Sequence, residues 1–164
     1  MILGMPQATF TFLHVLISLV GIAAGLIVLE RFFRNRVLGA SNVVFLAATI
    51  LTSVTGFVFP FKVFGTPAHF VGIVSLVALA IALFALYAGN VIGPWRWIYV
   101  CTAMLALYLN VFVAVAQSFA KIGRLHALAP TGSEPPFAIT QAIVLLVFVV
   151  LTIIALVRFR PPTA

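Results

Sequence analysis

The sequence predicts an all-α membrane protein, a bundle of five transmembrane helices with the N-terminus outside the cell and the C-terminus in the cytoplasm. Three observations support this fold class. Of the 164 residues, 65% are hydrophobic and only 7% are charged, and the mean hydropathy is +1.32. A soluble domain carries about 25% charged residues, so lipid is the solvent that this composition fits. The apolar residues also form five long runs, and the basic residues lie between these runs.

Each of the five runs is long enough to cross about 30 Å of hydrocarbon at about 1.5 Å per residue. The expected helices cover residues 10–29, 43–60, 69–88, 97–117 and 137–157. Residues that commonly begin or end helices lie between the runs. They are Ser41 and Asn42 at the second helix, Thr66 and Pro67 before the third, Gly89 and Asn90 after the third, and Ser133 and Glu134 before the fifth. No internal repeat is present, so residues 1–164 are expected to form a single transmembrane domain.

The basic residues predict the orientation, because cytoplasmic loops of membrane proteins are enriched in lysine and arginine. With five crossings, six basic residues fall on one side of the membrane and three on the other. The six are Arg31, Arg34, Arg36, Arg96, Arg158 and Arg160, and the three are Lys62, Lys121 and Arg124. The side with six is therefore expected to face the cytoplasm. Residues 1–13 lack the basic side chains of a cleavable signal peptide, so the first run is expected to be a true spanning helix.

The composition argues against several classes of protein. A net charge of +7 in a soluble protein would suggest nucleic-acid binding, but basic residues between apolar runs fit anionic lipid, and no nucleic-acid partner is expected. Cys101 is the only cysteine, which excludes an intramolecular disulfide. Glu30 and Glu134 are the only acidic residues, so no Ser-His-Asp triad, paired-carboxylate site or mid-membrane carboxylate is available. The sequence therefore favours a protein without catalytic activity of its own.

Polar and small residues share one face of the first helix and one face of the fourth. In the first helix His14, Ser18, Gly21 and Gly25 follow one another at spacings of four, three and four. Gly21 and Gly25 also predict the close approach of another helix. The stripe of the fourth helix consists of Ala103, Ala106, Asn110, Ala114, Gln117 and Lys121. Because polar groups that face lipid are costly, both stripes are expected to face the interior of the bundle.

These polar faces have two interpretations. In the first, small residues let helices approach and amides form hydrogen bonds between helices. In the second, they line a polar pocket in the outer half of the bundle, where Asn110, Gln117 and Gln141 form hydrogen bonds to a ligand. His14 and His69 map to the same outer half. If their helices are neighbours, the two imidazoles are able to hold a haem or a metal ion, although each alone also suits an interfacial polar residue.

Four stretches of the sequence resemble those of a set of small uncharacterised bacterial multi-pass inner-membrane proteins. They are TSVTGFVFPF at 52–61, WRWIYV at 95–100, YLNVFV at 108–113 and HALAPTGSEPPF at 126–137. The resemblance covers most of the chain and implies a bacterial inner membrane, without a named family or an activity. Translocator proteins have a similar size and span count, but their tryptophan-rich motifs are missing here.

The function expected from these observations is the binding of an apolar or redox ligand by a small membrane module. Quinone, haem and lipid-like molecules are the candidate ligands. The candidate cofactor-binding residues are His14, His69, Asn110, Gln117 and Gln141. One alternative is an accessory or structural membrane subunit whose stripes only pack against other helices, and another is a passive pore formed by oligomers. The expected partners are the lipid bilayer and either further copies of the chain or a larger membrane complex.

Overall fold

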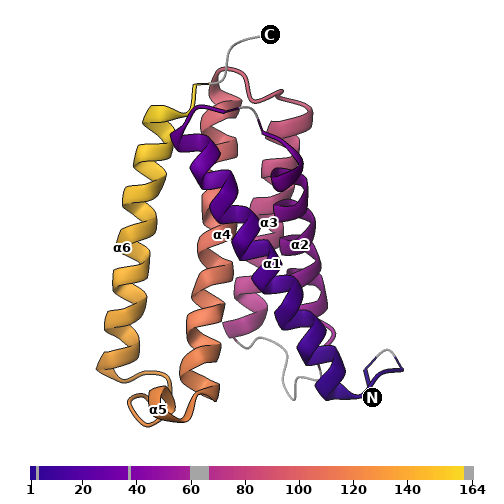
Figure 1. Ribbon diagram of the computed structural model, residues 1–164, viewed down its shortest axis with the longest axis vertical. Coiled ribbons are helices and arrows are strands. Elements are labelled where there is room, and N and C mark those ends of the chain that lie inside the picture. The colour runs from indigo at the N-terminus through magenta and orange to yellow at the C-terminus, as the bar shows by residue number, and fades with distance from the viewer. Residues whose placement is uncertain (3, 37, 60–66, 161–164) are drawn as a thin grey trace.

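The chain folds into helices joined by short loops (Figure 1). The computed structural model describes residues 1–2, 4–36, 38–59 and 67–160. The helices are α1 (Gln7–Phe33), α2 (Ala40–Gly56), α3 (Pro67–Tyr87), α4 (Pro94–Lys121), α5 (Gly123–His126) and α6 (Pro135–Arg158). Four of them, α1, α3, α4 and α6, are long and apolar enough to cross a membrane, whereas α2 is apolar but has only 17 residues. The predicted all-α class is confirmed, and the fold is that of a multi-pass membrane protein surrounded by lipid.

Prolines stand at the beginnings of three helices. Pro67, Pro94 and Pro135 are the first residues of α3, α4 and α6. The first turn of a helix tolerates proline, because its backbone nitrogen has no carbonyl partner there. Pro67 is therefore the helix start that the sequence predicts, while the neighbouring Thr66 lies outside the described residues.

The start of α2 differs from the prediction. The helix begins at Ala40 after Gly39, so Ser41 and Asn42 lie inside its first turn and do not cap it. Asn42 is instead 2% exposed, and its Oδ1 accepts a hydrogen bond from the buried Tyr99 hydroxyl on α4. The amide of Asn42 could either cap a helix or bond to a buried hydroxyl. It bonds to Tyr99 because α4 packs beside this position.

The helix lengths also depart from the apolar runs. α1 and α4 extend three or four residues beyond the predicted ranges at both ends, because polar residues at a membrane interface continue a helix without disturbing its hydrogen bonds. α2 is shorter than predicted, since it ends at Gly56 and is followed by turns at Phe57 and Val58. Pro60, the predicted end, lies outside the described residues. The four-residue α5 has no apolar run and was not predicted.

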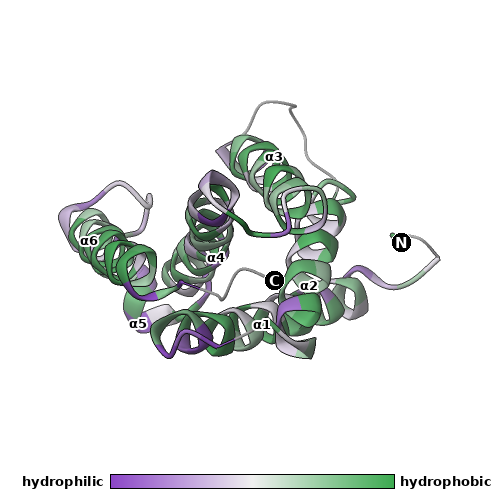
Figure 2. Cartoon of the chain, turned by 90° about the horizontal axis from the view of Figure 1, so that it is seen from above, coloured by the Kyte–Doolittle hydropathy of each residue, from purple (hydrophilic) through white to green (hydrophobic). Residues whose placement is uncertain are grey.

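Four helices form a ring, and α6 lies beside this ring (Figure 2). Around the ring, α1 packs on α2, α2 on α3, and α3 on α4, and α4 closes the ring against α1. α1 and α3 face each other across the ring and make no contact within the described part of the chain. α6 packs on α4 and α1 from outside. The ring is thus able to enclose a space between helices that do not touch.

Glycines let α1 approach its neighbours closely, as the sequence predicts. A Cβ atom at Gly25 would lie 2.5 Å from Leu107 Cδ1 of α4 and 2.9 Å from Phe45 Cδ2 of α2. A Cβ at Gly21 would lie 3.2 Å from Asn110 Nδ2. The predicted close-packing role of Gly21 and Gly25 is therefore confirmed, and Gly25 is the tighter position.

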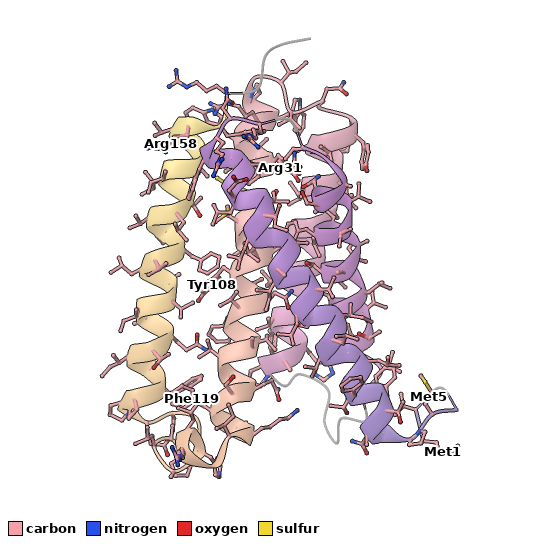
Figure 3. All side chains as sticks on the ribbon, in the orientation of Figure 1. Met1, Met5, Arg31, Tyr108, Phe119 and Arg158 are labelled. Atoms are coloured by element: carbon pink, nitrogen blue, oxygen red, sulfur yellow. The ribbon has the colours of Figure 1, made fainter. Side chains whose placement is uncertain are left out.

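One end of the bundle is rich in arginine. Figure 3 shows Arg31 and Arg158 at this end, opposite Met1 and Met5. Here Arg96 of α4 donates hydrogen bonds to the carbonyl oxygens of Leu156 and Phe159 at the end of α6. A cation stabilises the unpaired carbonyls at a helix C-terminus, so Arg96 attaches α6 to the ring. We refer to this end, with Arg31, Arg96 and Arg158, as the arginine end.

Candidate functional site

A pocket of about 440 Å³ lies inside the ring, toward the end opposite the arginine end. It is bounded by the first half of α1, the second half of α2, the beginning of α3 and the second half of α4. Its polar lining residues are Gln7, Thr11, His14, Thr49, Thr52, Ser53, His69, Ser75, Asn110, Gln117 and Lys121. Its other lining residues are Val15, Gly56, Phe57, Phe59, Ala68, Val71, Gly72, Leu109 and Val113. We refer to this space as the ring pocket.

The floor of the ring pocket is formed where α1, α2 and α4 meet. Gly21 lies against both Asn110 Nδ2 and Thr49 Oγ1, which would be 3.2 Å and 3.3 Å from a Cβ at that position. The hydroxyl of Ser18, one turn away on α1, donates a hydrogen bond of 2.8 Å to Asn110 Oδ1. This bond orients the amide, so that Nδ2 is the group left at the floor. Asn110 is only 6% exposed and Thr49 only 1%.

Three polar groups of the lining have no hydrogen-bond partner among the described residues. They are Asn110 Nδ2, Thr49 Oγ1 and Thr52 Oγ1. A buried polar group without a partner costs about 1–3 kcal/mol, and native proteins contain few of them. Of the five such atoms in the described part of the chain, these three belong to residues that line one pocket, and the other two, Ser41 Oγ and Gln141 Oε1, lie elsewhere.

The two threonines are also unusual among the helical threonines of this protein. Five others donate their hydroxyl hydrogen to the carbonyl of the residue four positions earlier, as is common inside apolar helices. They are Thr11, Thr55, Thr102, Thr140 and Thr152. Thr49 and Thr52 make no such bond. Both hydroxyls are therefore buried without a partner on their own helix.

His14 is held on the wall of the pocket by α2. Its Nδ1 lies 2.8 Å from Thr55 Oγ1, and that hydroxyl directs its own hydrogen at the carbonyl of Leu51, 2.6 Å away. In the neutral tautomer that satisfies both bonds, Nδ1 is the donor and Nε2 carries the lone pair. The ring also meets Phe59 edge to face, with centroids 5.2 Å apart. These two contacts fix the orientation of the imidazole.

His69 lies on the opposite wall, at the beginning of α3. It is 6% exposed, and its ring packs 5.7 Å from the ring of Phe57. Phe57 in turn lies against Gly72, where a Cβ would approach within 2.9 Å of the phenyl ring. The absence of a side chain at Gly72 thus lets the end of α2 pack on α3 beside His69.

The mouth of the pocket is polar and carries one positive charge. Gln7, Gln117 and Lys121 are exposed and line the pocket at the ends of α1 and α4. Lys121 is the only formally charged side chain in the described lining, which includes no carboxylate. The described lining is therefore neutral along its depth and positive at its entrance.

The ring pocket brings together four of the five residues predicted for a binding site. His14, His69, Asn110 and Gln117 all line it. Gln141 does not, because it lies between α6 and α4, where its Nε2 donates a hydrogen bond of 3.1 Å to the Phe112 carbonyl. Gln141 is buried, as expected for a polar residue of a spanning helix. It is buried between α6 and the outer side of α4, however, and not inside the ring.

The pocket also contains polar residues that the sequence analysis did not single out. Thr49 of α2 lies at the floor, beside Gly21 of α1. Ser75 of α3 accepts a hydrogen bond of 3.0 Å from Ser53 of α2 on the pocket wall. Thr49 is three residues before Thr52, and this helical spacing is the signal that could have identified it. Ser75 is six residues after His69, a spacing that does not place the two on one face.

The described residues do not gather a metal-binding cluster, since no three histidine, cysteine, aspartate or glutamate side chains lie close enough together. The chain matches no protein-family model, no curated protein and no solved structure. The chemistry of the ring pocket is therefore the basis for the function proposed below.

Proposed function

We propose that this protein is a five-span protein of the bacterial inner membrane that binds an apolar or redox ligand in the ring pocket. The N-terminus would face outward and the C-terminus the cytoplasm, so that the pocket opens to the outside. The observation that carries the proposal is the set of buried polar groups of the pocket lining, Asn110 Nδ2 and Thr49 Oγ1 at the floor and Thr52 Oγ1 one turn along α2, which lack partners in the described chain. Hydrogen bonds to a ligand would remove the cost of burying them.

The size and the walls of the pocket support this proposal. A volume of about 440 Å³ is within the range of about 300–1,000 Å³ that is typical of small-molecule sites. Val15, Val71, Leu109 and Val113 give the walls an apolar character between the polar positions. Apolar walls with a few placed polar groups suit amphipathic molecules such as quinones and lipids.

The floor supports a binding site better than a passive pore. At the floor Asn110 and Thr49 leave no free space for a Cβ on Gly21, and beyond it Leu107 and Phe45 leave none for a Cβ on Gly25. These contacts close the ring toward the arginine end. An accessory subunit remains compatible with this site, since bound ligand and partner protein use different surfaces.

Haem is a second candidate ligand because of the state of His14. In the tautomer in which Nδ1 donates to Thr55 Oγ1, Nε2 has the lone pair that an axial haem ligand needs. His14→Ala would then abolish a Soret band in the purified protein. His126→Ala, in the exposed α5, is the matched control and should leave the band unchanged.

The experiment that tests the proposal compares the bound molecules of two purified variants. Thr52→Phe places a phenyl ring in the pocket, and Leu146→Phe adds the same ring to the exposed face of α6. Each protein is purified in detergent, its absorption spectrum is recorded, and an organic extract is analysed by mass spectrometry. We expect a small molecule that is retained by the wild type and by Leu146→Phe and lost from Thr52→Phe. Identical extracts and spectra from all three proteins would contradict the proposal.

A further inference from the structure

We infer that the ligand of the ring pocket is a neutral amphiphile with carbonyl-type acceptor oxygens, of the quinone class, and that it enters head first and places a carbonyl oxygen at the floor. This inference rests on the proposed function and specifies its ligand. It depends on three properties of the pocket, namely the hydrogen-bonding character of its floor, the depth of that floor and the position of its charge.

The polar groups offered to a ligand are one amide nitrogen that only donates and two hydroxyls that donate or accept. The bond from Ser18 occupies Asn110 Oδ1, so the amide presents Nδ2, which can only donate. The hydroxyls of Thr49 and Thr52 are each able to donate as well, because neither bonds to its own helix. An oxygen atom that carries no hydrogen is the complement of such a floor. Quinone carbonyls, carboxylates and ester carbonyls provide this atom.

The depth of the floor distinguishes a neutral oxygen from a charged one. Asn110 lies eleven residues before Lys121 on α4, which corresponds to about 16 Å at about 1.5 Å per residue. Lys121 is the only cation in the described lining, so among the described residues that line the pocket no positive charge is within contact distance of the floor. A carboxylate there would be buried without an ionic partner, which is strongly unfavourable in the membrane. A neutral carbonyl gains the same hydrogen bonds without this cost.

The upper part of the pocket suits the remainder of such a molecule. The apolar side chains Val15, Leu109 and Val113 are in contact with the space between the floor and the mouth. The ring of Phe57 also borders this space. A flat ring and an isoprenoid or alkyl tail bury apolar surface against these groups, while the polar mouth faces the membrane interface.

Equilibrium binding to the purified protein in lipid nanodiscs tests the inference. The probes are decylubiquinone, decanoic acid and decanol, which have a similar chain and carry quinone carbonyls, a carboxylate and a hydroxyl. Asn110→Leu and Thr49→Val remove floor donors with little change of volume. Thr102→Val is the matched control, because its hydroxyl bonds to Ile98 O and lies outside the pocket.

We expect decylubiquinone to bind more tightly than the other two probes, and each floor substitution to raise its dissociation constant by about 5- to 10-fold. Thr102→Val should leave the constant unchanged. If Asn110→Leu does not fold, Thr49→Val and Thr52→Val provide the same comparison.

Other outcomes would overturn the inference in distinguishable ways. Decanoic acid as the tightest probe, with binding lost in Lys121→Gln, would replace the quinone class by an anionic amphiphile and leave the proposed function in place. Decylubiquinone binding that is equal in every floor variant would show that its head does not reach the floor. A failure of all three probes to bind, together with identical extracts from wild type and Thr52→Phe, would reject both the ligand class and the proposed function.

Discussion

At the scale of single residues, the bond between Tyr99 and Asn42 joins α4 to α2 through buried atoms. Tyr99→Phe would leave Asn42 Oδ1 without its donor, and we expect a loss of about 1–3 kcal/mol in the free energy of unfolding. Denaturant unfolding in detergent micelles measures this loss. Tyr87→Phe removes a hydroxyl from a side chain that is 68% exposed and should change the stability little. Equal losses in the two variants would mean that the buried hydrogen bond does not contribute to the free energy of unfolding.

Glu134 predicts a pH dependence in the loop before α6. Its carboxylate accepts hydrogen bonds from the backbone nitrogens of Thr131 and Ser133 and from the Thr131 hydroxyl. The bond from the Thr131 backbone is the main cause that lowers the pKa of Glu134 from 4.5 to about 2. Because the pKa is lowered on folding, the stabilisation is fully present above about pH 4.5 and is lost as the pH falls through about 2.

The measurement for this prediction is an NMR titration of the Glu134 carboxyl carbon. A midpoint near 2 is the expected result, and a midpoint near 4.5 would show that the loop does not hold these bonds in solution. Glu134→Gln should abolish the pH-dependent change in the amide signals of Thr131 and Ser133, since the amide does not titrate in this range.

At the scale of helices, Gly25 determines how closely α1 packs in the ring. A leucine at this position would overlap with Leu107 Cδ1 and with the ring of Phe45. We expect Gly25→Leu to reduce the free energy of unfolding by about 1–3 kcal/mol or more and to lower the yield of monodisperse protein. Ala23→Leu adds the same side chain to the exposed face of α1 and serves as the control. Equal yields and melting temperatures would contradict the assigned packing face.

At the scale of the whole molecule, the arginine end predicts the orientation in the membrane. Topology reporters fused after residues 34 and 89 and at the C-terminus should give cytoplasmic signals, and those after residues 64 and 132 should give external ones. A cytoplasmic signal at 132 would reverse the orientation. Equal signals at 34 and 64 would show that the 17-residue α2 does not cross.

Helical spacing predicted much of the fold and most of the site. Small and polar residues at intervals of three and four placed His14 and Asn110 on inward faces, because a helix has one buried face whatever surrounds it. Spacing alone does not reveal which neighbour a face meets. For that reason Gln141 was assigned to the pocket although α6 lies outside the ring, and Asn42 was assigned to a cap although α4 supplies its partner. The place of Thr49 at the pocket floor likewise depends on how α1 and α4 pack beside α2, which helical spacing does not show.

The closure of the ring has a consequence for how the protein is made. Every described lining residue of the pocket lies within the first 121 residues, and consecutive helices α1, α2, α3 and α4 pack on one another in the order in which a ribosome produces them. The bond between His14 and Thr55 is able to form once α2 has entered the bilayer, whereas Ser18 must wait for Asn110, 92 residues later in the chain. If the helices enter the bilayer in chain order, the partner of His14 is present before that of Ser18. All helices that line the pocket then precede α6.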